Sequence, residues 1–428
     1  MAVSARKVLG GFLGAQIATG IGAAAINVLS ARGLGPSGRG EVAFWLQVAV
    51  ILGVVLVAGT DRAYPATLSA APTFGEAVDD LRRLVAPGVA IVGGGCLLVV
   101  GALAAEHHRA TWLIAMTGLV AIGSAIASSL RAAAAASGVS GSFVVAAITG
   151  QAALIASGVA LLAIGVASPP IWLFAYAATW ATPVLIAAAV ASRSPQPLRR
   201  SRQLGKSRRL GARLMPSTAA GIIMLRADRL LLPALAGYTA LGLYGTVATI
   251  AELIAMPVQS YVDSHIPTWR HAHQSGNLNR GRIVAVIAVY AAAATVTVTV
   301  TVRLLLVPIF GAQYQDAIVL AGPLAGAVAL YAVSRAGVGL LLATEQPWRV
   351  NAVDIVAMAV AVSMYLLLIP RFGAMGAALG SLVGYGIGAA IALSMVVATR
   401  RRAAQPTAKL DSQLAGEERT ATGPALVR

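Results

Sequence analysis

Twelve long apolar stretches fill most of this 428-residue chain and leave little room for a water-soluble domain. Each stretch has 19 to 27 residues, and a helix of ~20 residues crosses the ~30 Å hydrocarbon core of a bilayer. The stretches are 8–30, 42–60, 85–105, 111–136, 142–166, 170–191, 216–236, 240–262, 283–307, 317–343, 350–369 and 374–398. The sequence therefore predicts an all-α polytopic membrane protein with twelve transmembrane helices.

The composition agrees with a chain that is solvated by lipid. Hydrophobic residues make up 58% and charged residues 11%, whereas soluble domains carry ~25% charge. The 45 glycines allow neighbouring helices to approach closely, as membrane helices must when lipid supplies no hydrophobic force between them. The first stretch is longer than the ~7–15-residue core of a signal peptide, so we expect it to be retained as a span.

Basic residues are distributed unequally between the two sides of the predicted topology. One side holds most of them: Arg6, Lys7, Arg82, Arg83, the run at 193–213, Arg270, Arg280, Arg282, Arg349 and Arg400 to Arg402. The other side holds few: Arg32, Arg39, Arg109, Arg303 and Arg371. Because Lys and Arg in short loops stay cytoplasmic, we expect a plasma (cytoplasmic) membrane protein with both termini in the cytoplasm. The net charge of +17 lies at membrane borders without interleaved aromatic residues, which indicates contact with anionic lipid rather than with nucleic acid.

This topology predicts that reporter proteins fused after residue 200 and after residue 400 both report a cytoplasmic location. Both fusion points lie on the side that carries the dense basic segments, which resist translocation. An external signal from either fusion would overturn the assignment of the two ends to one side.

A basic loop divides the spans into two sets of six. Residues 192–215 are rich in Arg and Ser, with Pro195 and Pro197 near the start, and we expect them to form a cytoplasmic linker. The linker separates an N-terminal six-helix bundle, 1–191, from a C-terminal six-helix bundle, 216–398. The polar residues 399–428 are expected to form a disordered cytoplasmic tail.

Each half has a related glycine-containing turn between its first two spans. The first reads Leu34-Gly35-Pro36-Ser37-Gly38-Arg39-Gly40, and the second reads Leu235-Ala236-Gly237-Tyr238-Thr239-Ala240-Leu241-Gly242-Leu243-Tyr244-Gly245. Duplicated six-helix units are a common transporter design, with the substrate path between the two units. The pattern thus predicts a central cavity between the bundles.

The sequence carries no motif of a soluble enzyme. It has no GxxxxGK[ST] phosphate loop and no HExxH zinc motif, so neither ATP hydrolysis nor metal catalysis is indicated. His265, His271 and His273 are interpreted as solvated loop residues rather than metal ligands. The first outer loop is short and contains only Glu41 as an acidic residue, which argues against a membrane glycosyltransferase. We expect a non-enzyme without a cofactor.

A few ionisable residues lie within or beside the spans, where a charge costs several kcal/mol unless it faces a partner or a cavity. They are Asp61, Arg62, Arg226, Asp228, Arg229, Glu252, Arg335 and Asp354. Asp61 and Arg62 follow the second span, which can continue as a broken helix through Tyr64-Pro65 to residue 71, or they mark its outer end. Asp354 lies near the inner end of its span and is expected at the interface.

Four arginines are the candidates for a cationic, substrate-binding cavity: Arg62, Arg226, Arg229 and Arg335. Arginine stays protonated and binds phosphate in a fork geometry, so such a cavity suits an anionic headgroup. The candidates for charge partners or coupling groups are Asp61, Asp228 and Glu252. Two alternatives stay open: salt bridges between the two halves, and a cation exporter that uses these carboxylates.

Four stretches match a known family in order and spacing. They are Ala31-Arg32-Gly33-Leu34-Gly35-Pro36 with Gly38 and Gly40; Arg226-Ala227-Asp228-Arg229-Leu230-Leu231-Leu232 followed by Leu241-Gly242-Leu243-Tyr244; Pro308-Ile309-Phe310-Gly311 with Tyr314 and Ala317; and Leu368-Ile369-Pro370-Arg371-Phe372-Gly373-Ala374-Met375-Gly376-Ala377-Ala378. With them the chain resembles the polysaccharide-biosynthesis flippases of the multidrug/oligosaccharidyl-lipid/polysaccharide (MOP) exporter superfamily. It departs from their LGP-x-x-[FY]-G turn at Arg39, where the family usually has an aromatic residue.

The resemblance implies two six-helix bundles around a central cavity and translocation of a polyprenyl-pyrophosphate-linked oligosaccharide or polysaccharide precursor from the inner to the outer leaflet. It implies alternating access without ATP, often driven by a proton or sodium gradient. Expected partners are the lipid-linked glycan, membrane lipids, and a polysaccharide polymerase or glycosyltransferases. The alternatives are a MATE-like cation or drug exporter and a non-transporting scaffold in cell-envelope assembly.

Overall fold

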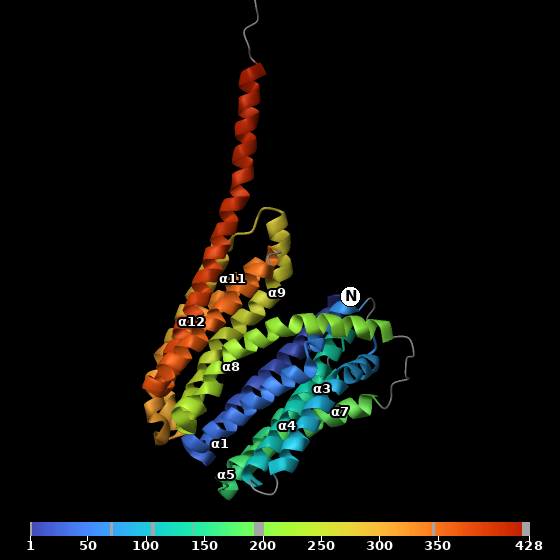
Figure 1. The fold of residues 1–428 in the computed structure, drawn as a ribbon, viewed down its shortest axis with the longest axis vertical. Helices are drawn as coiled ribbons and strands as arrows, with labels where there is room; N and C mark the ends of the chain where they lie inside the picture. Colours follow the sequence, from blue (N-terminus) through green and yellow to red (C-terminus); the bar gives the residue numbers. More distant parts are fainter. Residues whose placement is uncertain are drawn as a thin grey trace, which may run out of the picture.

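The computed structural model describes residues 2–68, 72–103, 108–139, 141–191, 201–344 and 347–421, and all regular structure in these ranges is helical (Figure 1). In chain order the elements are α1 (Ala2–Val57), α2 (Thr60–Thr67), α3 (Phe74–Leu103), α4 (His108–Ser137), α5 (Gly141–Ile164), α6 (Pro169–Thr179), α7 (Ala181–Ala191), α8 (Ser201–Ala251), η1 (Glu252–Ile254), α9 (Ala255–Gln274), α10 (Arg280–Phe310), η2 (Ala312–Leu320), α11 (Ala321–Ala343) and α12 (Pro347–Ala421). The predicted all-α class is confirmed.

Three of the long helices are pairs of helices joined at a kinked glycine. The kinks lie at Gly35 in α1 (φ 67°), Gly237 in α8 (φ 83°) and Gly373 in α12 (φ 54°). Glycine reaches this left-handed region without the steric cost of a Cβ atom. The chain reverses at each kink; in α12, for example, Gly380 packs on Tyr365 and Gly384 packs on Ala361.

The number of membrane crossings follows from these kinks. Among the described residues, nine helices are long and apolar enough to span a bilayer. Three of them, Ala18–Val57, Ile222–Ile266 and Trp348–Ala398, are 40, 45 and 51 residues long and contain the three kinks. Each of these can therefore cross twice, which is consistent with the twelve predicted spans.

Several predicted spans are interrupted, among them the sixth, which breaks at Trp180 between α6 and α7. The second span breaks at Ala58 and Gly59, both with positive φ, and continues as α2. The expected broken helix through Tyr64-Pro65 is therefore confirmed, although α2 ends at Thr67. The eighth span contains the short 3-10 helix η1, which begins at Glu252.

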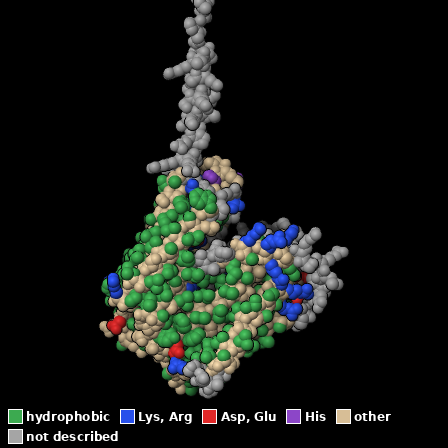
Figure 2. All heavy atoms as spheres, viewed as in Figure 1, with side chains coloured by type: hydrophobic (Ala, Val, Ile, Leu, Met, Phe, Trp, Pro, Cys, Tyr) green, Lys and Arg blue, Asp and Glu red, His purple; other side chains and the backbone are tan. Residues whose placement is uncertain are grey.

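The two halves have separate cores. We call residues 2–191 the N-half and residues 222–398 the C-half. Buried clusters of the N-half, such as the one that joins Leu56, Val85 and Val120, contain no buried residue of the C-half. Among the described residues, Ala31 is the one buried N-half residue in a C-half cluster. Large apolar side chains cover the outside of both halves, as a lipid-facing surface requires (Figure 2).

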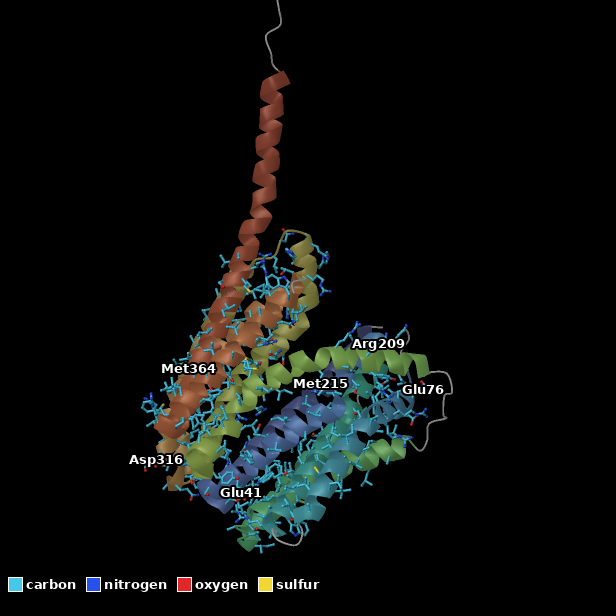
Figure 3. The ribbon with its side chains drawn as sticks, in the orientation of Figure 1. Glu41, Glu76, Arg209, Met215, Asp316 and Met364 are labelled. Carbon is cyan, nitrogen blue, oxygen red and sulfur yellow. The ribbon has the colours of Figure 1, made fainter. Side chains whose placement is uncertain are left out.

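The molecule has two distinct ends. The kinks at Gly35, Gly237 and Gly373 lie close together at one end, where Gly40 packs on Tyr238 and Gly373 lies beside Ala236; we call this the turn end. Glu41 and Asp316 lie there, and Arg209 and Glu76 lie toward the other end (Figure 3). The N-terminus and the projecting C-terminal helix also lie at that other end, which we call the terminal end (Figure 1).

The first turns of α8 form a strap across the terminal end of the N-half (Figure 1). The backbone of Gly211 packs on the backbone at Ala58 and Gly59, and the Ser207 hydroxyl lies 2.6 Å from the Thr67 hydroxyl. The basic linker predicted at 192–215 is thus helical from Ser201, while residues 192–200 lie outside the described ranges.

The structure differs from the sequence prediction at the C-terminus. Residues 399–428 were expected to be disordered, but α12 continues as a helix to Ala421. The segment is rich in Ala, Arg, Gln, Leu and Glu, which have high helix propensity and extend the helix of the last span. Residues 422–428 lie outside the described ranges.

Candidate functional site

A cavity of about 570 Å³ lies between the two halves. Its N-half wall comes from α1, α4, α5, α6 and α7, and its C-half wall comes from α8 and η1. Arg39 and Leu241 lie at its turn end, while the exposed Arg131 lies near the terminal end of α4. Figure 2 shows the two halves parted at the terminal end. The cavity therefore reaches from a floor near the turn end toward a mouth at the terminal end.

The charged residues of the cavity are mostly cationic. Among the residues that the structure describes, its lining contains four arginines, Arg39, Arg131, Arg226 and Arg229, and one carboxylate, Glu252. Neutral polar side chains line it as well, among them the amides of Asn27, Gln47 and Gln151. An excess of positive charge in a low-dielectric site favours an anionic ligand.

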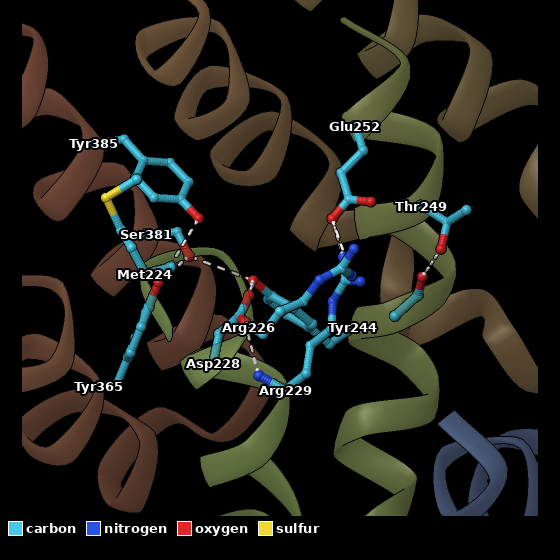
Figure 4. Close-up of polar contacts among 11 residues, drawn as sticks. Met224, Arg226, Asp228, Arg229, Tyr244, Thr249, Glu252, Tyr365, Ser381 and Tyr385 are labelled. Atoms are coloured by element: carbon cyan, nitrogen blue, oxygen red, sulfur yellow. Dashed lines mark hydrogen bonds and ion pairs between the residues drawn. The ribbon is translucent and has the colours of Figure 1, made fainter. Parts of the chain in front are cut away.

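Arg229 and Glu252 form the central ion pair of this wall. The two arms of α8 run antiparallel, so residue 229 of one arm faces the η1 turn at the end of the other arm (Figure 4). Arg229 is 6% exposed and binds Glu252 through Nη2, while Arg226 Nη1 lies 4.0 Å from the same carboxylate oxygen. One carboxylate thus serves two arginines. All three residues belong to the C-half. Arg226 and Arg229 therefore pair within one half, and not across the boundary between the halves as the salt-bridge alternative expected.

Asp228 lies on the other side of the same helix, in a buried hydrogen-bond network. Its side chain is 3% exposed; Oδ1 accepts a 2.8 Å bond from the Arg229 amide, and Oδ2 accepts the Tyr244 hydroxyl. Tyr244 lies 3.4 Å from the Ser381 hydroxyl, which in turn lies 2.9 Å from the Tyr365 hydroxyl (Figure 4). The network joins the seventh, eighth, eleventh and twelfth predicted spans.

The two halves are in close contact at the turn end, beyond the cavity floor. The backbone of Gly242 lies against Pro36, and that of Gly40 lies against Tyr238, so closely that a methyl group on either glycine would overlap a carbonyl oxygen. Arg39 Nη1 crosses the contact and donates to the Gly242 carbonyl at 2.8 Å. This end of the cavity is closed.

Further contacts between the halves lie beside the glycine contact. Arg32 donates through Nε to the Ile309 carbonyl at 2.7 Å and through Nη2 to the Pro308 carbonyl at 2.9 Å. The Tyr314 hydroxyl donates to the Ala31 carbonyl at 3.3 Å. Helix-breaking turns of both halves thus supply the carbonyls that hold the turn end shut.

The structure brings some sequence-predicted candidates together and separates others. Arg226, Arg229 and Glu252 line the cavity, and Asp228 lies directly behind them. Asp61 is half-buried in the first turn of α2 and is not among the lining residues. The side chain of Arg62 lies outside the described part of the structure.

Arg335 lies away from the cavity lining, inside the C-half. Its Nη1 is 3.4 Å from Asp354 Oδ1, and its guanidinium lies 6.0 Å from the centre of the Tyr331 ring. Asp354, which was expected at the interface, is therefore the partner of an arginine on the neighbouring helix. Both side chains are about one-fifth exposed, at 21% and 22%.

The Arg335–Asp354 ion pair is expected to stabilise the folded protein. Replacing Arg335 with Gln should lower the unfolding temperature of the purified protein, because a half-buried carboxylate loses its cation. The double variant Arg335→Gln/Asp354→Asn should recover most of that temperature. A thermal unfolding curve for the two variants and the parent protein measures both effects, and an unchanged midpoint for the single variant would contradict the prediction.

Two lining arginines, Arg39 and Arg131, were not among the candidates predicted from the sequence. Arg39 was assigned to the outer loop, although its place in the turn motif, where the family usually has an aromatic residue, marked it as unusual. Arg131 lies within the predicted span 111–136 and could have been found as an ionisable residue in an alanine-rich stretch.

No family model matches this chain, and no curated protein matches it. Solved structures do share its fold. An inward-facing multidrug resistance MATE family transporter of the MOP superfamily aligns with 90% of this chain and 96% of its own, with a TM-score of 0.65 and 13% identity. The lipid II flippase MurJ, in an inward closed conformation, aligns with 89% of this chain and 86% of its own, with a TM-score of 0.63 and 11% identity.

An outward-facing MATE family transporter of the MOP superfamily aligns with 93% of this chain and 96% of its own, with a TM-score of 0.56 and 14% identity. All three are transporters or flippases rather than enzymes. The chain therefore has the fold of MOP superfamily transporters, in a multi-pass membrane protein.

Proposed function

We propose that this protein is a flippase that moves a polyprenyl-pyrophosphate-linked glycan precursor across the cytoplasmic membrane by alternating access. The observation that carries the proposal is the cavity between the halves, whose described lining has four arginines and one carboxylate. Arginine forms bidentate, charge-assisted hydrogen bonds with phosphate oxygens. One carboxylate cannot neutralise four arginines, and the pyrophosphate diester of the substrate would supply the remaining negative charge.

The size and polarity of the cavity support the same substrate class. Its volume of about 570 Å³ is within the ~300–1,000 Å³ range of sites that enclose small molecules, so it fits a headgroup rather than a polymer. The neutral amides of Asn27, Gln47 and Gln151 are hydrogen-bonding groups suited to sugar hydroxyls. The prenyl chain would stay in lipid, beside the apolar outer surface.

A MATE-like cation exporter is the second candidate, and the fold comparisons favour it equally. Glu252 is its strongest support, since this carboxylate lines the cavity and its side chain is 36% exposed. Glu252 is bound to Arg229, however, and Arg226 lies 4.0 Å away, so a cargo cation would meet two arginines at the same carboxylate. Repulsion between like charges in a low-dielectric cavity disfavours that cargo.

The flippase proposal is tested in cells. A strain without this protein should lose a surface glycan and accumulate its lipid-linked precursor in the inner leaflet, where a polymerase on the outer side cannot reach it. Changed sensitivity to cationic dyes with intact glycans would instead identify a drug exporter. Loss of the glycan without accumulation of a precursor would identify a scaffold for the glycosyltransferases.

The closed turn end supports an inward-facing state, with the turn end toward the outer leaflet. The basic strap, with exposed Lys206 and Arg209, lies at the opposite end and would then face the cytoplasm. The cavity mouth near Arg131 would open to the leaflet in which lipid-linked sugars are assembled. Transport then requires that the turn-end contacts between the halves open.

We propose Asp228 as the group that couples transport to a proton or sodium gradient. It is a carboxylate buried in the C-half, adjacent in sequence to the cargo-binding Arg229 and bonded to that residue's amide. Through Tyr244 and Ser381, its hydrogen-bond network connects α8 with both arms of α12. Neutralisation of Asp228 would change the packing of the helix that carries Arg226 and Arg229.

Replacing Asp228 with Asn should abolish stimulation of transport by an ion gradient in proteoliposomes, because the side chain can no longer bind a proton or contribute its charge to a sodium site. The control is Tyr365→Phe, which removes the hydroxyl next to Ser381 but leaves the carboxylate in place. Transport rates with and without an imposed gradient measure the effect. Gradient-driven transport at the parent rate in the Asp228→Asn protein would refute the assignment.

A further inference from the structure

We propose that Arg39 is an anion-binding latch: it holds the turn end closed through the Gly242 carbonyl and releases it when a pyrophosphate group reaches the cavity floor. The inference rests on the proposed function for the source of the pyrophosphate. It adds a binding residue at the point where this chain departs from the family turn motif, and it links occupation of the cavity to opening of its far end.

The position of Arg39 supports both parts of this role. The residue follows the Gly35 kink in α1 and is 4% exposed, yet it belongs to the cavity lining. Its Nη1 donates to Gly242 across the boundary between the halves at 2.8 Å, and its Nη2 donates to Asn27 of its own half at 3.0 Å. It is thus anchored on α1 and bonded to the opposite half.

The charge of Arg39 is not balanced by any described residue. Both of its hydrogen-bond partners are neutral oxygens, and its Nε is buried without a partner. The other cationic side chains near the cavity centre share Glu252. A buried guanidinium without a counter-ion is costly in a membrane protein, and an anion in the cavity would reduce that cost.

An anion can displace the Gly242 carbonyl without leaving that carbonyl unsatisfied. The Thr246 hydroxyl also donates to the Gly242 carbonyl, at 2.8 Å. The carbonyl therefore keeps a donor when Arg39 turns away. A phosphate oxygen is a stronger acceptor for arginine than a neutral carbonyl, because the hydrogen bond is charge-assisted on both sides. The guanidinium lies beside Gly245, where a side chain would be in van der Waals contact with Nη1 at 3.6 Å, so the absence of a side chain there leaves this face of Arg39 uncovered.

A neighbouring arginine offers a matched control. Arg32 also lies at the turn end of α1 and also bonds to two carbonyls of the C-half, but it is exposed and does not line the cavity. It can contribute to closure, but it is not placed to sense an anion inside the cavity. Variants of the two arginines therefore distinguish two effects: the loss of a hydrogen bond between the halves, which both variants share, and the loss of the response to an anion, which is expected only for Arg39.

The test measures opening of the turn end by electron paramagnetic resonance. Spin labels are attached to the full chain at Ala167→Cys and Phe372→Cys, which are exposed on opposite halves at the turn end, in a Cys96→Ser background. Inorganic pyrophosphate is titrated at constant ionic strength, with sulfate as the comparison anion. In the parent protein, pyrophosphate should increase the long-distance population.

Arg39→Gln should raise the long-distance population without pyrophosphate and abolish its response to pyrophosphate. Arg32→Gln should keep the response. Arg39→Lys, which preserves charge without the fork, should respond with a half-saturation concentration about 10- to 100-fold higher. Geranyl pyrophosphate should increase the long-distance population at a lower concentration than inorganic pyrophosphate, because the proposed substrate is a lipid-linked pyrophosphate.

A pyrophosphate response that survives in Arg39→Gln would overturn the proposal, and so would its loss in Arg32→Gln. If the Arg39→Gln protein does not fold, the Arg39→Lys protein is measured instead. The proposal is then overturned if Arg39→Lys has the same half-saturation concentration for pyrophosphate as the parent. The assay needs no glycan and no flipping. A failed latch with intact glycan flipping would therefore refute this inference alone, whereas absent flipping with an intact response would refute only the flippase.

Discussion

Replacing Arg229 with Gln should reduce glycan export by one to two orders of magnitude. A charge-assisted phosphate contact contributes ~1.5–3 kcal/mol, and a factor of ten in affinity corresponds to ~1.4 kcal/mol. Arg229→Lys should keep part of the activity, because the charge survives while the bidentate geometry is lost. Export is measured as surface glycan per molecule of transporter in the membrane, so that a lower protein level is corrected for.

The ion pair with Glu252 gives Arg229 a structural role as well, and a double variant separates the two roles. Arg229→Gln alone leaves Glu252 with only Arg226, at 4.0 Å. Arg229→Gln/Glu252→Gln removes both charges and should restore the protein level. It should not restore export if Arg229 binds the cargo. Full export by the double variant would show that Arg229 is needed only to neutralise Glu252.

Replacing Gly40 or Gly242 with Ala should shift the protein away from the state in which the turn end is closed. In either variant the new methyl group overlaps a backbone carbonyl of the other half, at Tyr238 or at Pro36, and backbone cannot move aside as a flexible side chain can. Overpacking costs ~1–3 kcal/mol, which changes the ratio of closed to open molecules by about 5- to 150-fold.

The distance between spin labels at Ala167→Cys and Phe372→Cys reports this shift, and the long-distance population should dominate in both glycine variants. Gly20→Ala in α1 is the control, because an added methyl group there meets no atom within 4 Å. An unchanged distance distribution in Gly40→Ala and Gly242→Ala would mean that the glycine contact is not what closes the turn end.

The turns of this fold could be predicted from sequence because glycine determines them locally. Gly35, Gly237 and Gly373 all lie in the quoted motifs, and all three adopt positive φ where the chain reverses. A broken second span was one of two alternatives that the sequence left open, and the break lies at Ala58 and Gly59, before Tyr64-Pro65. Span lengths and short polar connections follow from the thickness of the bilayer, so the helical class needed no knowledge of tertiary contacts.

The candidate site was only partly predictable from the sequence. Which charged residues pair depends on how the two antiparallel arms of a kinked helix are aligned. The sequence placed Arg229 and Glu252 in neighbouring spans, but only the kink at Gly237 brings residues 23 positions apart into contact. Arg335 has the same sequence character as Arg229, yet it lies on α11 facing Asp354. Hydropathy identifies buried charges but does not say which side of a helix faces the cavity.

Arg39 was missed for a related reason. A turn between two spans is normally in water, and an arginine there is normally a surface residue. In this fold the turn of the N-half is covered by the corresponding turn of the C-half, through Gly40 and Gly242. Only the tertiary contact makes Arg39 a buried residue at the floor of the cavity.

The most direct test of the mechanism is a flipping assay with the purified full chain in proteoliposomes. A fluorescent polyprenyl-pyrophosphate oligosaccharide is placed in one leaflet, and its arrival in the other is followed with a membrane-impermeant quencher. We expect transfer well above that of protein-free liposomes, and its reduction to near that level in the Arg229→Gln protein. Transfer no faster than in protein-free liposomes, together with uptake of a cationic dye by the same proteoliposomes, would contradict the proposed function.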